Sequence, residues 1–272
     1  MTTDWTAKTF DETYIRAEGL NIDPRVTASD CDAIIQILKL QTGQRVLDLA
    51  CGHGRHVFEL AKRGFEPLQG LDFSEAAIKF ATAQGQETGA KASFILADMR
   101  ELTIEAEFDA VYNLGNSIFY WDEATHQKIL EGVARALKPG GKLLLDVYNR
   151  DRLVSDLALK QHPAVRLYTR ARGIAGRVKR LLQTKKPINP NRLRSTKIWR
   201  FNVETGVFEG IMRVVLPDGQ TRQTPIQTRL YTLTELRGLL ERSGFEIEQV
   251  SGFAGEPIQT FTSRFAVLAR KA

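Results

Sequence analysis

The sequence predicts an α/β protein: a mostly parallel sheet covered by helices on both faces, with an antiparallel meander inserted. Three observations support this fold class. Short apolar runs alternate with longer amphipathic segments from residue 44 to about residue 148, the alternation resumes at residue 232, and the stretch between has a different character. Strands separated by helices form a parallel sheet, because the chain must cross back over the sheet between them. The 272 residues suffice for one large core, or for a core with an insert.

The first half of the chain supplies most of the sheet. Two helices, over 11–18 and 29–40, precede the first strand. Five strands are expected over 45–50, 67–72, 92–97, 108–113 and 142–148, and helices over 55–63, 74–87 and 122–137 connect them. Ser74 and Asp122 are suitable N-caps, and Lys138-Pro-Gly-Gly ends the helix before the fifth strand.

The second half contains the insert and the end of the sheet. The expected elements are a basic amphipathic helix over 164–182, a loop over 183–195, meander strands over 198–202, 207–215 and 224–231, a helix over 232–243, and strands over 245–250 and 263–269. Thr232-Leu-Thr-Glu235 is a capping box that opens this last helix. We therefore divide the chain into residues 1–150, an insert over 151–230, and residues 231–272.

Charge is distributed unevenly along the chain. Residues 150–200 contain 15 Lys and Arg but only two acids, Asp151 and Asp156, whereas the remainder carries 23 bases and 30 acids. A basic segment on an acidic domain points to a local site or surface.

Two cysteines, Cys31 and Cys51, are too few for a disulfide framework or a zinc cage, and no cluster has metal-ligand spacing. No apolar run is long enough for a membrane span and the N-terminus lacks signal-peptide features, so we expect a cytoplasmic protein.

The most informative stretch is Val46-Leu-Asp-Leu-Ala-Cys-Gly-His-Gly-Arg-His56, in which a strand passes through a glycine-containing loop into a helix. Glycines let a ligand approach the backbone, and the helix N-terminus offers free N–H groups. A dinucleotide is disfavoured, because Asp48 places a carboxylate where a pyrophosphate would lie and the G-x-G-x-x-G spacing is missing. An aspartate at this position suits a cationic ligand. A nicotinamide-dependent oxidoreductase on a related sheet stays open as an alternative.

Three further strand ends fit the same ligand. Asp72 ends the second strand, where an acid can accept hydrogen bonds from both hydroxyls of a ribose. Asp98 and Met99 follow the third strand and could bind an adenine, and Asn113 ends the fourth. Ligands of open α/β sheets bind beyond the carboxyl ends of the strands, so these loops should gather at one edge.

In order and spacing, the motifs VLDLACGHGRH, LQGLDFS, ILADMR, FDAVYNLGNS and LKPGGKLLLDV resemble those of class I S-adenosylmethionine-dependent methyltransferases. The resemblance covers roughly residues 40–150 and 228–270, with Ala50 where many members have glycine. It implies a Rossmann-like, seven-stranded, mostly parallel sheet with an antiparallel last strand, and S-adenosylmethionine as cofactor, released as S-adenosylhomocysteine. The residues that it places around the cofactor are Asp48, Ala50, Cys51, Gly52, Gly54, Arg55, Asp72, Phe73, Asp98, Met99, Asn113 and Leu114.

The residues that would carry the reaction are less well defined. A sulfonium methyl is already activated, so proximity and orientation can supply much of the rate enhancement and a general base is optional. The catalytic candidates are Tyr14, Tyr148, Arg229 and Tyr231, and the candidates for substrate contact are Tyr120, Trp121 and Asn149. For His53 and His56, loop packing or capping is favoured over catalysis, and His126 is expected to be solvated on its helix.

These observations predict methyl transfer by in-line displacement to an N or O atom of a small molecule, with an anionic acceptor suggested by the basic segment. Two alternatives use that same segment over 150–200: an RNA-modifying methyltransferase, and a membrane-surface methyltransferase acting on a lipid-like acceptor. Nucleic acid is disfavoured because no RNA-binding module is recognisable. No metal is expected, peripheral membrane contact stays open, and so does the choice between monomer and homodimer.

Overall fold

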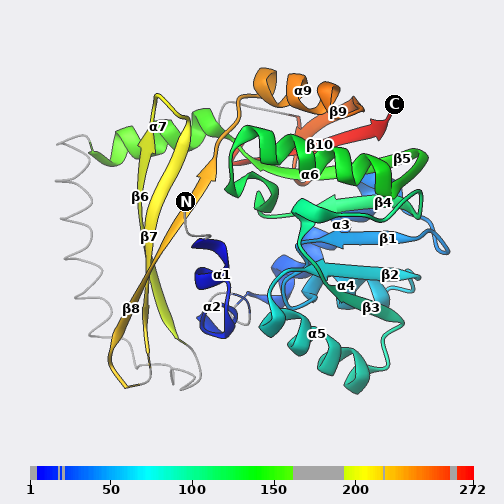
Figure 1. Ribbon diagram of the computed structural model, residues 1–272, viewed down its shortest axis with the longest axis horizontal. Coiled ribbons are helices and arrows are strands. Elements are labelled where there is room, and N and C mark those ends of the chain that lie inside the picture. The colour runs from blue at the N-terminus through cyan, green and yellow to red at the C-terminus, as the bar shows by residue number, and fades with distance from the viewer. Residues whose placement is uncertain (1–4, 18, 20–21, 162–192, 217, 258–261) are drawn as a thin grey trace.

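The main sheet of the computed structural model has seven strands (Figure 1). The structure describes residues 5–17, 19, 22–161, 193–216, 218–257 and 262–272. The strands are β1 (Val46–Leu49), β2 (Leu68–Asp72), β3 (Ala92–Leu96), β4 (Phe108–Asn113), β5 (Leu137–Tyr148), β9 (Phe245–Gly252) and β10 (Arg264–Lys271), in the order β3-β2-β1-β4-β5-β10-β9. Strands β1 to β5 pair in parallel, and β10 is antiparallel to both of its neighbours. This confirms the predicted fold class.

Helices cover both faces of the sheet. One face packs against α3 (Pro24–Leu38), α4 (Arg55–Lys62) and α5 (Glu75–Thr88), and the other against α6 (Glu123–Ala136) and α9 (Leu233–Arg242). The side chains of β1 alternate accordingly: Leu47 and Leu49 are buried toward α6 and α9, whereas Val46 is buried toward α3 and α4. Asp48 has the same parity as Val46, so it points toward the α3 and α4 face at the carboxyl end of the strand.

A second, antiparallel sheet stands beside the first. It consists of β6 (Arg194–Asn202), β7 (Val207–Val215) and β8 (Thr221–Arg229), and α1 (Trp5–Thr9) and α2 (Glu12–Ala17) lie between the two sheets (Figure 1). Strand β8 is bonded both to the N-terminal segment and to the loop after β4. Thr9 Oγ1 donates to the carbonyl of Pro225 at 3.0 Å, Arg222 pairs with Asp11, and Asn116 Nδ2 donates to Thr228 Oγ1 at 2.7 Å.

The predicted helix starts at Ser74, Asp122 and Thr232 are confirmed. Each side chain accepts a hydrogen bond from the first turn of its helix, and the capping box between Thr232 and Glu235 is complete. Other boundaries differ from expectation. Helix α3 begins earlier than residue 29, because Asp23 accepts a bond from the N–H of Arg25 and a proline occupies the first helical position.

Several elements were not anticipated or have shifted. Helices α1 and α7 (Arg150–Gln161) are additional, and the meander strands β6 and β8 each begin earlier than expected. The predicted basic helix over 164–182, and most of the loop over 183–195, lie outside the described residues.

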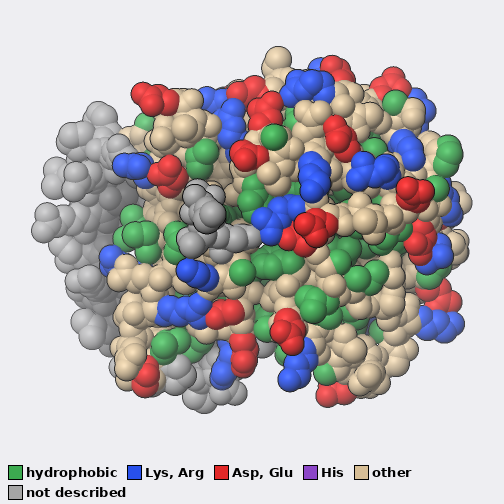
Figure 2. Space-filling view, in the orientation of Figure 1, with side chains coloured by type: hydrophobic (Ala, Val, Ile, Leu, Met, Phe, Trp, Pro, Cys, Tyr) green, Lys and Arg blue, Asp and Glu red, His purple; other side chains and the backbone are tan. Residues whose placement is uncertain are grey.

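The described surface carries charges of both signs. On the face shown in Figure 2, Lys and Arg side chains are interspersed with Asp and Glu over both sheets. Within the described ranges, no helix combines the length and the hydrophobicity that crossing a membrane requires.

Candidate functional site

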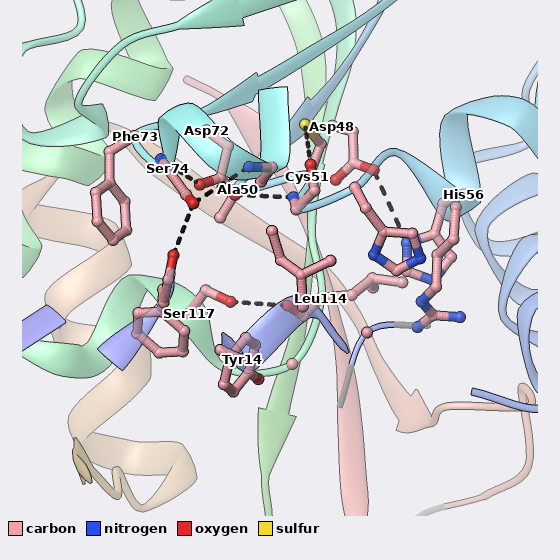
Figure 3. Close-up of a pocket in the computed structure, with 18 of the residues that line it drawn as sticks. Tyr14, Asp48, Ala50, Cys51, His56, Asp72, Phe73, Ser74, Leu114 and Ser117 are labelled. Carbon is pink, nitrogen blue, oxygen red and sulfur yellow. Dashed lines mark hydrogen bonds and ion pairs between the residues drawn. The ribbon is translucent and has the colours of Figure 1, made fainter. Parts of the chain in front are cut away.

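A cavity of about 450 Å³ lies at the carboxyl ends of β1, β2, β4 and β5, next to α2 and the residues that join it to α1 (Figure 3). A volume of this size is typical of small-molecule sites. Much of the lining comes from loops that follow parallel strands, as expected for an open α/β sheet. The N-terminal segment adds Phe10 and Tyr14, which come from a distant part of the chain.

The loop after β1 forms the floor and has an unusual backbone. Ala50, Gly52 and Gly54 all have positive φ values, of 64°, 56° and 80°. At Gly54 a side chain is excluded, because a Cβ would lie 2.8 Å from the ring of Phe94. Ala50 adopts a conformation that favours glycine, so this loop stores some backbone strain at the site.

Asp48 contributes its carboxylate to the lining of the cavity. The residue is 2% exposed, and its Oδ2 accepts no hydrogen bond from any described residue. The nearby basic group is His56, whose Nδ1 lies 3.8 Å from Oδ2 (Figure 3). A buried carboxylate without a bonded cation is costly, so this group suits a ligand that brings a donor or a positive charge.

Asp72 lies on the neighbouring strand end and is held by backbone donors. Its Oδ2 accepts from the N–H of Gly52 at 2.8 Å, and its Oδ1 from the N–H of Ser74 at 2.9 Å. Burial raises the pKa of the Asp72 carboxyl above its usual value, although these two hydrogen bonds act in the opposite direction. Phe73 and the buried Met99 line the cavity beside it.

Behind Asp48, a buried ion-pair network surrounds Asp30. Its carboxylate accepts from Arg55 at 2.8 Å and contacts His56 Nε2 at 3.2 Å. Burial raises the pKa of Asp30, but the bonds to His56 and Arg55 outweigh it, and the net direction is downward. Arg264 lies beside this network and makes a two-point ion pair with the fully buried Asp146, with distances of 2.7 and 2.5 Å. Both guanidinium groups that line the cavity are therefore already paired.

Most residues predicted to surround a cofactor do meet at this cavity. Those that line it are Asp48, Ala50, Cys51, Gly52, Arg55, Asp72, Phe73, Met99 and Leu114. Three lie elsewhere. Gly54 packs behind the loop against Phe94, Asp98 is bound by Arg100, and Asn113 Nδ2 donates to the carbonyl of Leu49 at 2.7 Å.

The candidates for catalysis and substrate contact divide in the same way. Tyr14, Tyr148, Tyr120 and Trp121 line the cavity. The remaining three are engaged outside it. Arg229 pairs with Glu235, the Tyr231 hydroxyl bonds His126 at 2.8 Å, and Asn149 Nδ2 donates to the carbonyl of Thr262 at 2.7 Å.

Some lining residues were not predicted. Phe10, Ser74, Ser117 and Arg264 belong to this group, and His53 lines the cavity with a pKa that burial lowers to about 4. A phenylalanine between two short N-terminal helices, or an arginine that opens the last strand, carries no local signal of this role. Among the described residues, no His, Cys, Asp or Glu group is arranged to hold a metal ion.

Comparison with known proteins agrees with this geometry. Residues 46–141 match a family model described as a methyltransferase domain. The protein YqeM of Bacillus subtilis (strain 168) is 40% identical over 109 residues, which are 39% of this chain and 42% of that protein. The chain thus spans less than half the length of that relative.

Two further matches extend over nearly the whole chain. The cypemycin N-terminal methyltransferase of a Streptomyces species is 29% identical over 91% of both chains. The structure of an S-adenosylmethionine-dependent methyltransferase from Clostridium acetobutylicum ATCC 824 superimposes with a TM-score of 0.68 and 17% identity, covering 94% of this chain and 95% of that one. The latter likeness establishes the fold.

Proposed function

We infer that this chain, whose residues 46–141 form a methyltransferase domain on the class I Rossmann-like fold, transfers a methyl group from S-adenosylmethionine to an N or O atom of a small molecule. The transfer proceeds by in-line displacement. The named relatives, including one that methylates at an N-terminus, favour a methyltransferase over the oxidoreductase alternative.

The single observation that carries this proposal is the Asp48 carboxylate, which lines the cavity while its buried Oδ2 makes no hydrogen bond to any described residue. It lies in a cavity that also contains the Asp72 carboxylate at the next strand end. S-adenosylmethionine has an ammonium group, a ribose diol and an adenine. Asp48 suits the ammonium group, Asp72 suits the hydroxyls, and Phe73 and Met99 offer apolar surface for the adenine.

The residues of the chain then have to position the reactants and exclude water. When bound, S-adenosylmethionine supplies a methyl group that its sulfonium already activates. The loop from Ala50 to Gly52 brings backbone close to the ligand, and the packed N-terminal helices keep water from one side of the cavity. Tyr14, Tyr120 and Tyr148 form the part of the lining left for the acceptor.

Three finer expectations depend on the basic segment over 150–200. These are an anionic acceptor, an RNA substrate and a membrane-surface location. Residues 162–192, which carry much of that charge, lie outside the described residues. The two arginines that line the cavity are bound by Asp30 and Asp146, so the described part of the site adds no support for an anionic acceptor.

The proposal is tested by titrating S-adenosylhomocysteine into the protein in a calorimeter. We expect binding, and we expect Asp48→Asn to weaken it by about 1.5–3 kcal/mol, the scale of a lost hydrogen bond to a charged group. The matched control is Asp109→Asn, on β4 but paired with Lys138 away from the cavity, which should leave affinity unchanged. No binding by the wild type, or equal affinity in Asp48→Asn, would contradict the proposal.

The acceptor class is tested by supplying methyl-labelled S-adenosylmethionine together with a cell extract. Label in a small extractable product is the expected result. Label that disappears on nuclease treatment would instead identify an RNA substrate.

A further inference from the structure

One wall of the cavity is built almost entirely from aromatic rings. This aromatic wall consists of Phe10, Tyr14, Phe73, Tyr120, Trp121 and Tyr148. Phe10 stacks on Tyr120 with ring centroids 5.3 Å apart and planes 19° apart, and Phe10 and Tyr14 meet edge to face with centroids 4.8 Å apart. Phe73 and Trp121 continue the cluster at 6.2 and 6.1 Å from Phe10 and Tyr120. The faces of such rings are negative and attract cations.

The charges around the cavity have a net negative balance. Arg55 and Arg264 are neutralised by Asp30 and Asp146, which lie behind the lining. Among the described residues, no Lys or Arg pairs with the carboxylates of Asp48 and Asp72, and His56 Nδ1 lies 3.8 Å from Asp48 Oδ2. The proposed methyl donor carries one net positive charge, so it balances only part of this excess. A second cationic group is therefore tolerated in the same cavity.

The aromatic wall offers little that could remove a proton from an acceptor. Its polar groups are phenols and the indole N–H of Trp121, with the hydroxyl of Ser117 beside them. Burial raises the pKa of Tyr120 well above its usual value, which makes its hydroxyl a still less available base. A hydroxyl acceptor would need a base at the moment of attack, whereas an amine that has given its ammonium proton to water attacks with a free lone pair.

We propose that the aromatic wall binds the methyl acceptor as an aliphatic amine, holding its nitrogen by contact with the ring faces of Phe10, Tyr14 and Tyr120. This proposal rests on the proposed function. The acceptor binds as its ammonium form and gives one proton to water; the freed lone pair then forms the new N–CH₃ bond while the S–CH₃ bond breaks, and that bond's electron pair stays on sulfur. The positive charge moves from sulfur to nitrogen, and the product ammonium gives its proton to water after release.

The second sheet holds the aromatic wall in place. Gln227 on β8 donates to the carbonyl of Tyr120 at 3.4 Å, and Thr9 at the end of α1 donates to the carbonyl of Pro225 on the same strand. Ser74 of the main domain donates to the carbonyl of Phe10 at 2.6 Å. The two stacked rings therefore come from segments that β8 and the main sheet jointly position, so the wall is formed before an acceptor arrives.

The test compares choline with its neutral isostere 3,3-dimethylbutan-1-ol as probes, titrated calorimetrically into protein saturated with S-adenosylhomocysteine. The two have the same shape and differ in one positive charge. We expect choline to bind roughly 10-fold more tightly, the scale of a desolvated cation–π contact. Tyr120→Leu should abolish this preference, and Tyr120→Phe, which retains the ring, should preserve it.

The matched control is Phe80→Leu, an aromatic residue on α5 outside the wall, which should retain the preference. The affinity of each variant for S-adenosylhomocysteine shows whether its site is folded. Equal binding of the two probes, or binding of neither while S-adenosylhomocysteine still binds, would overturn the amine proposal and leave the proposed function standing. Failure of S-adenosylhomocysteine itself to bind would overturn both.

Discussion

At the scale of single residues, His126 shows how burial can reverse an expectation. The sequence pattern suggests a solvated histidine on α6, but the structure buries it completely. Its Nε2 accepts from the backbone N–H of Trp121 at 3.1 Å, which leaves Nδ1 to carry the proton and donate to the Tyr231 hydroxyl at 2.8 Å. Tyr231, proposed from the sequence as a catalytic candidate, thus belongs to a buried hydrogen-bond pair between α6 and the start of α9.

This pair predicts acid sensitivity. Burial lowers the pKa of His126 from 6.5 to about 4, so the folded state binds fewer protons than the unfolded state between these values. The resulting stability is fully present above pH 6.5 and is lost as the pH falls from 6.5 to about 4. The expected loss is about 3 kcal/mol, from roughly 1.4 kcal/mol per pKa unit. Urea unfolding across this range should show the loss in the wild type.

The matched comparison for this prediction is His126→Gln, which retains polar atoms but does not titrate. Its unfolding free energy should fall less steeply over the same pH range. His53 also has a pKa lowered to about 4, so His53→Gln is measured alongside to separate the two contributions. Identical pH slopes in the wild type and His126→Gln would contradict the assignment.

At the scale of elements, the helix starts are set by local side-chain chemistry. The caps at Ser74, Asp122 and Thr232 follow from residues adjacent in sequence, which is why they could be predicted. Helix α1 could not be, because it is only five residues long and is stabilised by aromatic contacts of Trp5 with Phe10 and Tyr120. Isolated helices this short are unstable in water.

The capping box of α9 gives a direct test at this scale. Thr232→Ala removes the oxygen that accepts from the N–H of Glu235 at 3.2 Å. The free energy of unfolding should fall by about 1 kcal/mol, the usual contribution of an N-cap. Thr232→Ser retains the oxygen and should change it little. An equal loss in both variants would show that the threonine methyl, rather than the cap, matters.

At the scale of the whole molecule, the second sheet connects the loop after β4 with the N-terminal helices. Thr228 on β8 accepts from the buried amide of Asn116 and donates to the carbonyl of Phe119 at 3.2 Å. These contacts join β8 to the loop after β4, more than 100 residues earlier in the chain. The same strand holds α1 and α2, so the cavity depends on three separate segments meeting correctly.

Two threonines on β8 allow this connection to be tested. Thr228→Val leaves the Asn116 amide buried without its partner and should cost about 1–3 kcal/mol in unfolding free energy. Thr224→Val is the control, because its buried Oγ1 has no hydrogen-bond partner among the described residues. That replacement should be neutral or stabilising. Similar losses in both variants would mean that packing, and not the bridging hydrogen bond, holds the second sheet.

The residue pattern alone predicted the alternation of strands and helices in the main sheet, the glycine-containing loop after the first strand, and Asp48 and Asp72 at the strand ends. These features are local, since periodicity, caps and strand ends depend on neighbouring residues. Only the tertiary structure decided which aromatic residues face the cavity, and that Arg229, Tyr231 and Asn149 do not line it. Asn113 and Asp98 sit at the correct strand ends, yet hydrogen bonds to Leu49 and Arg100 engage their side chains. The hydrogen-bond partners of these side chains depend on how distant segments pack together, and such packing leaves no periodic pattern in the sequence.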